Sequence, residues 1–264
     1  MIINNQIIKA KSIDELKQKL ARIEDPIILD IVLSTDDFAS SKYVEMKKKL
    51  GQELGIKVNV HRSYSDVNIE ASNGVIIQIP CASEEEQYLE VIPKHLDIDL
   101  FNNRDQMLRY GILPPTIKGI FQVLDNPKDL RGKTIVVIGQ GKLVGKPLID
   151  CLLDYEATII SCNEHTHNIK KYTQDAFIII SGTGVPNLID ESWINKEKPQ
   201  YWIDAGTAES NGKIIGDIDQ SIGEYSNIHL CPSPKGIGPL TVVNIFHNLV
   251  DMYVLKSLLT KESN

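Results

Sequence analysis

The chain has 264 residues, of which 42% are hydrophobic and 24% are charged, and its formal net charge is −7 at pH 7. This composition is that of a globular protein, the length suffices for two domains, and the negative charge argues against a nucleic-acid surface. No apolar stretch approaches a membrane span, and the first residues lack the basic-then-apolar layout of a signal peptide, so we expect a cytoplasmic protein.

Helical and strand-like segments alternate along the first half of the chain, which favours a parallel α/β fold. The expected elements are a helix over 13–23, a strand over 27–33, a helix over 43–54, strands over 57–61 and 74–79, and a helix over 84–92. Ser41 is expected to cap the second helix and Gly55 to end it. Only 12 residues separate His61 from Gly74, the lower limit for a parallel crossover, so any helix between them must be very short.

The helix expected over 43–54 carries a lysine in an unusual place. Tyr43 and Lys47 share one helical face with two leucines, whereas the two lysines that follow Lys47 point elsewhere. A lysine on an apolar face either extends its ammonium group to water or lies in a cleft among partners. In a cleft, burial lowers its pKa and makes it usable as an acid, a base or a polarising cation. The pattern leaves both alternatives open.

Polar residues also stand at the end of the strand over 74–79 and shortly after the next helix. Gln78 interrupts an apolar run near the C-terminal end of its strand, where open parallel sheets bind ligands. Its amide needs hydrogen-bond partners, and strand-end backbone is the simplest alternative to a ligand. Asp97 and Asp99 alternate sides, so they need not act together, and either can cap the next segment.

The second half of the chain continues the alternation. Its expected elements are a helix over 118–124, a turn between Asn126-Pro127 and Gly132, a strand over 134–138, a helix over 144–153, strands over 158–161, 176–181, 201–204 and 228–230, and a C-terminal helix over 241–258. This order of strands and helices again favours a parallel α/β fold.

A glycine-rich turn joins the strand over 134–138 to the following helix. This order of strand, tight turn and helix start is the one that binds nucleotide phosphates. Gly139 permits the turn, Gly141 lets the backbone approach a pyrophosphate, and Gly145 lets the helix pack closely on the strand. The spacing G-x-G-x-x-x-G is one residue longer than the standard fingerprint, so a purely structural turn is the alternative.

A second glycine-rich loop, from Cys231 to Thr241, precedes the C-terminal helix. Gly236 and Gly238 allow its backbone to lie close to a flat ring, and Thr241 can cap the helix. An ordinary strand-to-helix loop is the alternative.

Neither the cysteines nor the histidines indicate a metal site. The four cysteines lie far apart, without a C-x-x-C pair. His165 and His167 flank Thr166, but no carboxylate or cysteine stands at a ligand spacing. We therefore expect no metal.

Together these segments resemble the methylenetetrahydrofolate dehydrogenase/cyclohydrolase family over nearly the whole chain. The matching segments, in family order, are Tyr43-Val44-x-x-Lys47, Gly55-Ile56, Gly74 to Pro80, Asp97-Ile98-Asp99, Val137 to Pro147, Ala157 to Thr166, Gly182 to Pro186, Ile203 to Gly206, Gly216 to Asp219 and Pro234 to Thr241. Each motif is modest alone, and their order and spacing together are specific.

The resemblance implies a two-domain α/β fold. An N-terminal catalytic domain would comprise residues 1–117 plus 242–264, and a Rossmann-like NAD(P)-binding domain with a parallel sheet would comprise 118–241. Family members oxidise the methylene bridge of tetrahydrofolate with a nicotinamide and often hydrolyse the methenyl product to the formyl form. They are usually dimeric through the nucleotide domain, so the implied partners are a folate one-carbon substrate and a second copy, with no nucleic acid and no membrane.

The resemblance also implies residue roles. Lys47 would be the key catalytic residue, Gln78 would tune it by hydrogen bonding, Tyr43 would stack near the folate, and Asp99 would bind the pterin edge. Further substrate-binding residues would be Gly236, Ile237, Gly238, Pro239 and Thr241. The cofactor-binding residues would be Gly139, Gln140, Gly141, Val144, Gly145, Glu164, Thr166, Gly182 and Gly206.

Some positions depart from the family pattern. Leu100 replaces the glycine after Asp99, residues 102–107 lack the Pro-x-Asn-x-Gly segment, and Lys235 replaces the first of two glycines. Gln140 replaces an arginine and Glu164 a serine at positions that help hold the 2′-phosphate of NADP in the family. The family favours NADP, whereas these two residues favour NAD, because an acidic group repels the phosphate and can bond a ribose hydroxyl.

Three alternatives to a bifunctional enzyme stay open, and the departures motivate the first of them. The first is a monofunctional NAD-dependent methylenetetrahydrofolate dehydrogenase without cyclohydrolase activity. The second is a different Rossmann oxidoreductase with a small-acid substrate, and the third is a non-catalytic relative that binds folate without turning it over.

Overall fold

The computed structural model describes residues 1–102, 104–125 and 130–262, the last three of these by their backbone alone. Residue contacts divide the chain into two compact units. Unit 1 consists of Met1–Lys9 and Thr116–Thr241, and unit 2 of Ala10–Pro115 and Val242–Asn264. Each unit is built on a parallel sheet, which confirms the expected α/β fold class.

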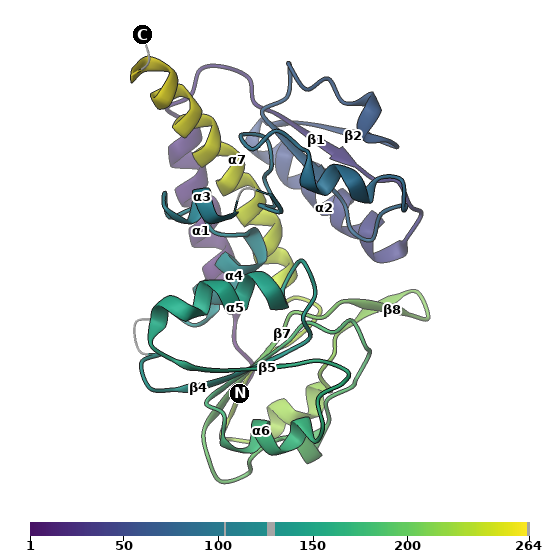
Figure 1. Ribbon diagram of the computed structural model, residues 1–264, viewed down its shortest axis with the longest axis vertical. Helices are drawn as coiled ribbons and strands as arrows, with labels where there is room; N and C mark the ends of the chain where they lie inside the picture. Colours follow the sequence, from purple (N-terminus) through teal and green to yellow (C-terminus); the bar gives the residue numbers. More distant parts are fainter. Residues whose placement is uncertain (103, 126–129, 263–264) are drawn as a thin grey trace. The chain divides into compact units, whose positions relative to one another are not determined.

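Unit 2 contains a three-stranded parallel sheet in the order β2-β1-β3 (Figure 1). Its elements are α1 (Asn5–Leu20), β1 (Ile28–Val32), α2 (Phe38–Leu54), β2 (Lys57–His61), β3 (Gly74–Ile77), α3 (Arg104–Leu108) and α7 (Ile237–Glu262). The short link between β2 and β3 holds only the 3-10 turn Tyr64–Asp66. This link passes β1, which lies between the two strands that it joins.

Both faces of the unit 2 sheet are covered by apolar side chains. Leu29 and Ile31 belong to a core cluster that also contains side chains of α1, α2 and α7. Val32 and Val75, which point to the opposite face, pack with Leu89 and its neighbours. Successive strand residues alternate between faces, so the ends of β1 and β3 are held by two cores at once.

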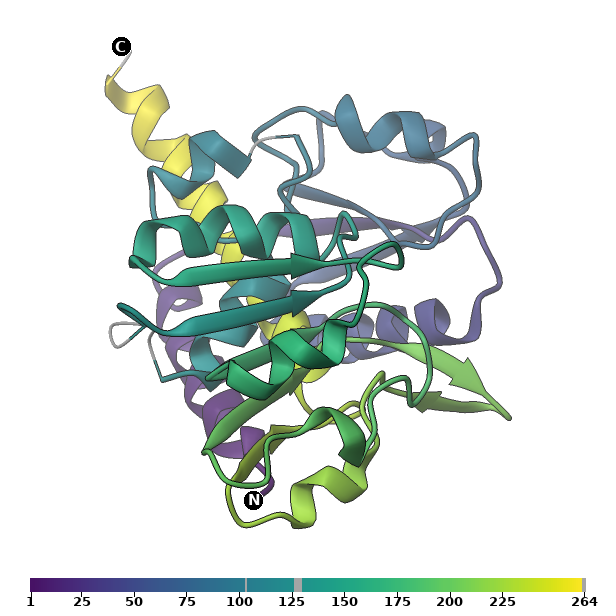
Figure 2. The same ribbon diagram turned by 60° about the horizontal axis from the view of Figure 1, so that its bottom comes forward.

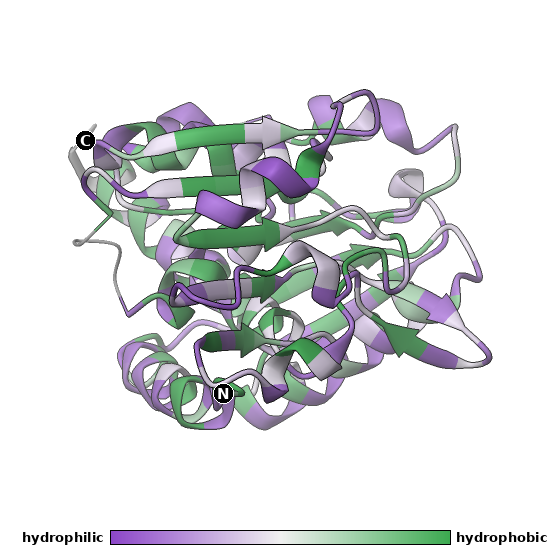
Figure 3. Ribbon diagram, turned by 90° about the horizontal axis from the view of Figure 1, so that it is seen from below, coloured by the Kyte–Doolittle hydropathy of each residue, from purple (hydrophilic) through white to green (hydrophobic). Residues whose placement is uncertain are grey.

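Unit 1 contains a five-stranded parallel sheet in the order β10-β7-β6-β4-β5 (Figure 2). Its elements are α4 (Pro115–Val123), β4 (Thr134–Ile138), α5 (Gly145–Leu152), β5 (Thr158–Cys162), α6 (Ile169–Asp175), β6 (Ile178–Ser181), β7 (Gln200–Asp204), the antiparallel pair β8 (Ala208–Ser210) and β9 (Lys213–Ile215), and β10 (Ile228–Cys231). Helices α4 and α5 lie on one face of the sheet and α6 on the other. The strands are mostly hydrophobic, as their colours in Figure 3 show.

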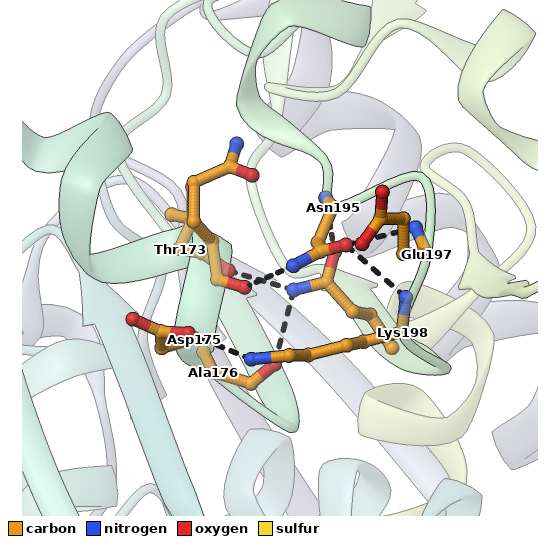
Figure 4. A network of polar contacts seen from close by, with 8 residues as sticks. Thr173, Asp175, Ala176, Asn195, Glu197 and Lys198 are labelled. Carbon is orange, nitrogen blue, oxygen red and sulfur yellow. Dashed lines mark hydrogen bonds and ion pairs between the residues drawn. The ribbon is translucent and has the colours of Figure 1, made fainter.

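Polar contacts close the connection between α6 and β7. Gln200 Nε2 donates to the carbonyl oxygens of Thr173 and Ala176 at 2.6 and 3.0 Å. Lys198 Nζ pairs with Asp175 at 2.8 Å, and Figure 4 shows how these groups point toward one another. The end of α6 is thereby fixed to the start of β7.

The first nine residues lie with unit 1, whereas the sequence analysis expected them in the N-terminal domain. Ile3 N donates to Leu230 O at 2.8 Å, and Leu230 N donates to Met1 O at 2.9 Å. The start of the chain therefore extends the sheet beside β10, a pairing between residues more than 220 positions apart that no local pattern indicates.

Several expected element boundaries were wrong. Helix α2 begins at Phe38 and is capped by Asp37, whose carboxylate accepts from Ser40 N at 2.7 Å, so Ser41 is not the cap. Helix α7 begins at Ile237, so Thr241 lies inside it and its hydroxyl donates to Ile237 O. The expected helix over 84–92 is a 3-10 turn at Glu86–Glu90. The expected turn at Asn126-Pro127 lies outside the described residues.

The remaining differences are one earlier helix start and several elements that were not expected from the sequence. Helix α1 begins eight residues earlier than expected, at Asn5 rather than at position 13. Helices α3 and α6 and the β8–β9 pair were not predicted. Among the described residues, no helix combines the length and apolar character that crossing a bilayer requires.

Candidate functional site

Lys47 is a buried lysine on the inner face of α2. It is 4% exposed, whereas the side chain of Lys48, one residue further, is 48% exposed. Lys47 Nζ donates a hydrogen bond to Gln78 Oε1 at 2.7 Å. Of the two alternatives left open by the sequence, the structure therefore shows the lysine held among partners rather than extended into solvent.

Gln78 is fixed in the orientation that accepts from the lysine. Its backbone N–H donates to Val32 O at 2.9 Å, which continues the pairing of β3 with β1 past the last strand residue. Its side-chain Nε2 donates to Ile79 O at 3.0 Å, so the amide oxygen is the atom that faces Lys47. The hydrogen bond between Lys47 and Gln78 that the resemblance implied is present.

Asp99 completes a charged pair with Lys47. Burial lowers the pKa of Lys47, and the negative charge of Asp99 opposes this lowering. Burial likewise raises the pKa of Asp99, and Lys47 opposes the rise. Each charge thus makes the other less unfavourable in a site from which water is largely excluded. Tyr43, half-buried one turn earlier on α2, lies on the same helical face as Lys47.

This arrangement suits proton transfer and charge stabilisation. A lysine whose pKa is lowered by burial supplies both the ammonium and the amine form nearer to neutral pH than a free lysine does. The glutamine oxygen fixes where one of its protons points, and the negative charge of Asp99 favours its ammonium form. Unit 2 therefore holds a dry amine with defined partners, which is the requirement for a general acid or base.

The glycine loop of unit 1 has two glycines that packing requires and one that it does not. Gly139 adopts φ +98°, and a Cβ there would lie 2.6 Å from Gly182 O. A Cβ on Gly145, the first residue of α5, would lie 1.9 Å from Gly139 O. Gly141 has no atom within 4 Å of a built Cβ. Its missing side chain therefore has no structural explanation and leaves backbone accessible.

The start of α5 is suited to an anion. Val144 stands at the N-cap position and makes no side-chain capping hydrogen bond. Lys146 N donates to Gly141 O at 3.2 Å, and Pro147 has no N–H, which leaves the Gly145 N–H as the donor of the first turn that can face an anion. Gly182, after β6, leaves room for the side chain of Val144, because a Cβ there would lie 2.9 Å from Val144 Cγ1. The residues present fit a bound nucleotide phosphate at this loop.

Gln140 belongs to a hydrogen-bonded network at the ends of β4 and β5. Its Nε2 donates to Ser161 Oγ at 2.7 Å, and its Oε1 accepts from Asn163 Nδ2 at 3.1 Å. Thr166 Oγ1 accepts from Asn163 N at 3.0 Å. Glu164 points outward with its side chain 80% exposed. Ser161 and Asn163 were not among the expected site residues. Both lie at the C-terminal end of β5, the place at which domains of this kind bind the ribose of a dinucleotide.

Gly206 lies against a pair of buried carboxylates. Asp204 accepts from the backbone N–H groups of Gly206 and Asp217 at 3.0 and 3.1 Å, and Asp217 accepts from the Ser181 hydroxyl at 2.6 Å. A Cβ on Gly206 would lie 2.0 Å from Asp217 Oδ1. The position of the Asp217 carboxylate therefore leaves no room for a side chain at Gly206, whether or not a cofactor is bound. Burial raises the pKa of Asp204 to about 7, and the charge of Asp217 adds to the rise.

Asp204→Asn should flatten the pH dependence of unit 1 stability. The folded-state pKa of Asp204 is about 7, against an ordinary 3.8. Between these values the folded state keeps a proton that the unfolded chain has lost, so stability falls as pH rises through this window. The fall is at most about 4 kcal/mol, since one pKa unit corresponds to about 1.4 kcal/mol.

Urea unfolding followed by tryptophan fluorescence between about pH 5 and pH 8 measures this effect. Trp193 and Trp202, the two tryptophans of the chain, both lie in unit 1, so the signal reports that unit. Equal pH slopes for the wild type and Asp204→Asn would contradict the assignment.

The expected substrate loop at 236–241 lies in unit 1, whereas Lys47, Gln78 and Asp99 lie in unit 2. A Cβ on Gly236 would lie 2.1 Å from Pro232 O, and Ile237 is 2% exposed. Gly238 and Pro239 are half-buried in the first turn of α7. Ile237 is therefore buried rather than presented to a ligand.

Within the described residues, no three His, Cys, Asp or Glu side chains gather in a way that could hold a metal ion.

Comparisons with known proteins agree on one family. The sequence model described as tetrahydrofolate dehydrogenase/cyclohydrolase, NAD(P)-binding domain, matches residues 114–257. Relatives named bifunctional protein FolD from Hydrogenobaculum sp. (strain Y04AAS1) and Aquifex aeolicus (strain VF5) are 31% and 30% identical to this chain, over 96% and 97% of it and 98% and 96% of theirs. The crystal structure of the bifunctional FolD enzyme from Campylobacter jejuni is 28% identical, covers 97% of this chain and 99% of its own, and has a TM-score of 0.84.

Proposed function

The chain belongs to the tetrahydrofolate dehydrogenase/cyclohydrolase family, and from this premise we propose that Lys47, Gln78 and Asp99 form the centre at which its folate substrate reacts. The chain oxidises methylene-tetrahydrofolate to methenyl-tetrahydrofolate with a nicotinamide cofactor and hydrolyses the methenyl form to formyl-tetrahydrofolate. The observation that supports the proposal most directly is the buried hydrogen bond from Lys47 Nζ to Gln78 Oε1 at 2.7 Å.

In the oxidation, the chain's own residues bind and orient the folate. A bound nicotinamide accepts the hydride that leaves the methylene bridge. Asp99 accepts hydrogen bonds from the pterin edge, and Tyr43 packs against the substrate ring beside it. Lys47, held by Gln78, acts in this step as the neutral amine, because an ammonium would oppose the positive charge that develops on the bridge as the hydride leaves. Because the site is largely dry, these interactions are stronger than they would be in water.

In the hydrolysis, Lys47 moves a proton. Its amine form accepts a proton from the water whose oxygen bonds to the methenyl carbon. Nζ then returns this proton to the nitrogen that is freed when a C–N bond breaks, and the hydroxyl proton of the intermediate leaves to solvent. Lowering of the Lys47 pKa by burial raises the share of amine available for the first transfer.

The nucleotide loop supports a nicotinamide dinucleotide in unit 1. Gly139 and Gly145 shape the turn, Gly141 would let the backbone approach the pyrophosphate, and the Gly145 N–H at the start of α5 would face a phosphate. Thr166 orders the segment after β5 by its hydrogen bond with Asn163 N.

We further propose that the preferred cofactor is NAD. Gln140 is neutral, and both of its side-chain polar groups are engaged by Ser161 and Asn163. The exposed carboxylate of Glu164 would repel the 2′-phosphate of NADP and can accept from a ribose hydroxyl of NAD. His165 Nε2 lies 3.6 Å from the Glu164 carboxylate, so this imidazole faces Glu164 rather than offering a separate phosphate site.

Exchanging these two residues should reverse the preference. The double variant Gln140→Arg/Glu164→Ser gains a charge-assisted partner for the 2′-phosphate and loses a repulsive one, which we expect to change the kcat/KM ratio of NADP over NAD by roughly 10- to 100-fold. Steady-state assays with each nicotinamide measure this ratio. Glu209→Ser, which removes an acid from the β8–β9 pair, is the control and should leave the ratio unchanged.

One paired assay tests the activity as a whole. Purified protein is mixed with tetrahydrofolate, formaldehyde and either nicotinamide, and the hydrolysis of methenyl-tetrahydrofolate is measured in parallel. Dehydrogenase activity without hydrolysis would favour the monofunctional alternative. Reduction that does not depend on tetrahydrofolate would indicate a different oxidoreductase, and folate binding with neither activity a non-catalytic relative.

The assembly and location that we propose follow the family resemblance. The protein would be a cytoplasmic homodimer without nucleic-acid or membrane partners. Light scattering of the purified chain distinguishes a mass of twice 29.6 kDa from a monomer.

A further inference from the structure

Asp97 is a buried carboxylate two residues before Asp99. It is 1% exposed, and its backbone pairs with Val75, the second residue of β3. Its Oδ2 accepts from Asn102 N at 2.8 Å. Burial raises its pKa to about 6, and hydrogen bonds from the backbone N–H groups of Asn102, Phe101 and Leu100 oppose the rise. The Asp97 carboxylate thus interacts with the backbone N–H groups of the three residues that follow Asp99.

The turn that Asp97 closes is conformationally costly. Leu100 adopts φ +61°, the left-handed region that a residue with a Cβ occupies at a cost of about 1 kcal/mol. The family resemblance places a glycine here, which would carry no such cost. The Leu100 side chain is buried in the main core of unit 2 at 1% exposure. Because leucine does not favour this conformation by itself, the neighbouring hydrogen bonds must maintain it.

A second anchor lies on the other side of Asp99. Asn248 of α7 is fully buried, and its Nδ2 donates to Ile98 O at 3.2 Å and to Leu113 O at 2.9 Å. The carbonyl of Ile98 directly precedes Asp99 in the chain. Asp99 is therefore held by the amide of Asn248 on one side and by the carboxylate of Asp97 on the other.

We propose that Asp97 and Asn248 are positioning residues that fix Asp99 in the orientation that binds the substrate. The proposal rests on the function proposed above, in which Asp99 accepts from the pterin edge. Neither residue needs to touch the substrate. Their task is to hold a turn that the sequence of this chain, with leucine in place of glycine, does not favour by itself.

Asp97→Asn tests the proposal because it weakens the hydrogen bonds that position Asp99 while it keeps the packing around residue 97. The amide has nearly the same shape, and it removes a buried carboxylate whose burial is unfavourable, so the fold should be as stable as the wild type or more so. A neutral oxygen holds the backbone N–H groups more weakly. We therefore expect the KM for methylene-tetrahydrofolate to rise roughly 10-fold or more, because small displacements of binding groups have large effects, while the KM for the nicotinamide stays within about 2-fold.

Two further variants complete the experiment. Asn248→Ser, which shortens the second anchor, should raise the folate KM in the same way, and Asp105→Asn, an exposed acid on α3, should change neither KM. The thermal midpoint is followed by circular dichroism, since the tryptophans report unit 1 alone.

The outcomes distinguish this proposal from the proposed function. An unchanged folate KM in Asp97→Asn would overturn the positioning role. So would a parallel rise in both KM values with a lowered thermal midpoint, which would indicate general loosening. A wild-type protein without either activity would instead overturn the proposed function.

Discussion

Lys47→Met should abolish the hydrolysis of methenyl-tetrahydrofolate, with a loss of about 10²- to 10⁴-fold, the range that a general acid or base contributes. Methionine fills a similar volume but carries neither a proton nor a charge. Dehydrogenase activity should also fall, to a smaller extent, because the amine beside the bridge is lost whereas hydride transfer to the nicotinamide needs no proton from the lysine.

The fold should tolerate this substitution. Lys47 is 4% exposed, and replacing a buried charge by an apolar group of similar volume is often neutral or stabilising. The Gln78 side-chain oxygen loses its hydrogen-bond donor in this variant, which limits any increase in the free energy of unfolding. Circular dichroism and the thermal midpoint of Lys47→Met should therefore resemble those of the wild type, so that lost activity cannot be attributed to unfolding.

Lys48→Met is the matched control. Lys48 is the next residue on α2, its side chain is 48% exposed, and it pairs with Glu45 at the surface. The same substitution there should leave both activities within about 2-fold, since exposed ion pairs contribute little. Full cyclohydrolase activity in Lys47→Met would refute the assignment of the catalytic lysine.

Gly145→Ala and Gly141→Ala should separate the structural from the ligand-binding role of the glycine loop. A Cβ on Gly145 would meet Gly139 O at 1.9 Å, a backbone atom that cannot rotate away. We expect Gly145→Ala to destabilise unit 1 by about 1–3 kcal/mol, the usual cost of overpacking, and to weaken nicotinamide binding because the turn must shift.

Gly141→Ala should leave stability unchanged, because its Cβ meets nothing within 4 Å. It should still weaken nicotinamide binding by 10-fold or more if a pyrophosphate lies against this backbone, since a methyl group would then intervene. Urea unfolding by tryptophan fluorescence and titration with NAD measure the two effects separately. Normal NAD affinity in Gly141→Ala would place the pyrophosphate elsewhere.

The two tests are informative together because they act on different units. Lys47 lies in unit 2 and the glycine loop in unit 1. A protein that has lost hydrolysis in Lys47→Met should still bind the nicotinamide normally, and Gly141→Ala should retain hydrolysis, which needs no hydride acceptor.

The candidate site was predictable where a residue conflicted with its local pattern. Lys47 stood on an apolar helical face, and Gln78 interrupted an apolar strand, so each required partners that the structure then supplied. The glycine loop was predictable for the same reason, because three glycines between a strand and a helix indicate close backbone approach.

Other parts of the site had no local signal. Asp97 and Asn248 are 151 positions apart, and the Asp204–Asp217 pair joins the end of β7 to a segment beyond the β8–β9 hairpin. Aspartate and asparagine residues occur throughout the chain. Only folding distinguishes those that are buried and hydrogen-bonded to distant segments. Asp97 could be interpreted from sequence only as one of two aspartates that need not act together.

The sequence by itself determined the alternation of strands and helices, the face on which Lys47 lies and the glycines that a tight turn requires. These features depend on side-chain periodicity and backbone sterics within a few residues, so the local sequence contains all the information they need. Tertiary structure alone decided that residues 1–3 extend the sheet beside β10, that Asp37 rather than Ser41 caps α2, and that Leu100 is held in a left-handed turn. Each of these depends on competition between local preference and contacts with distant segments, and burial decides that competition.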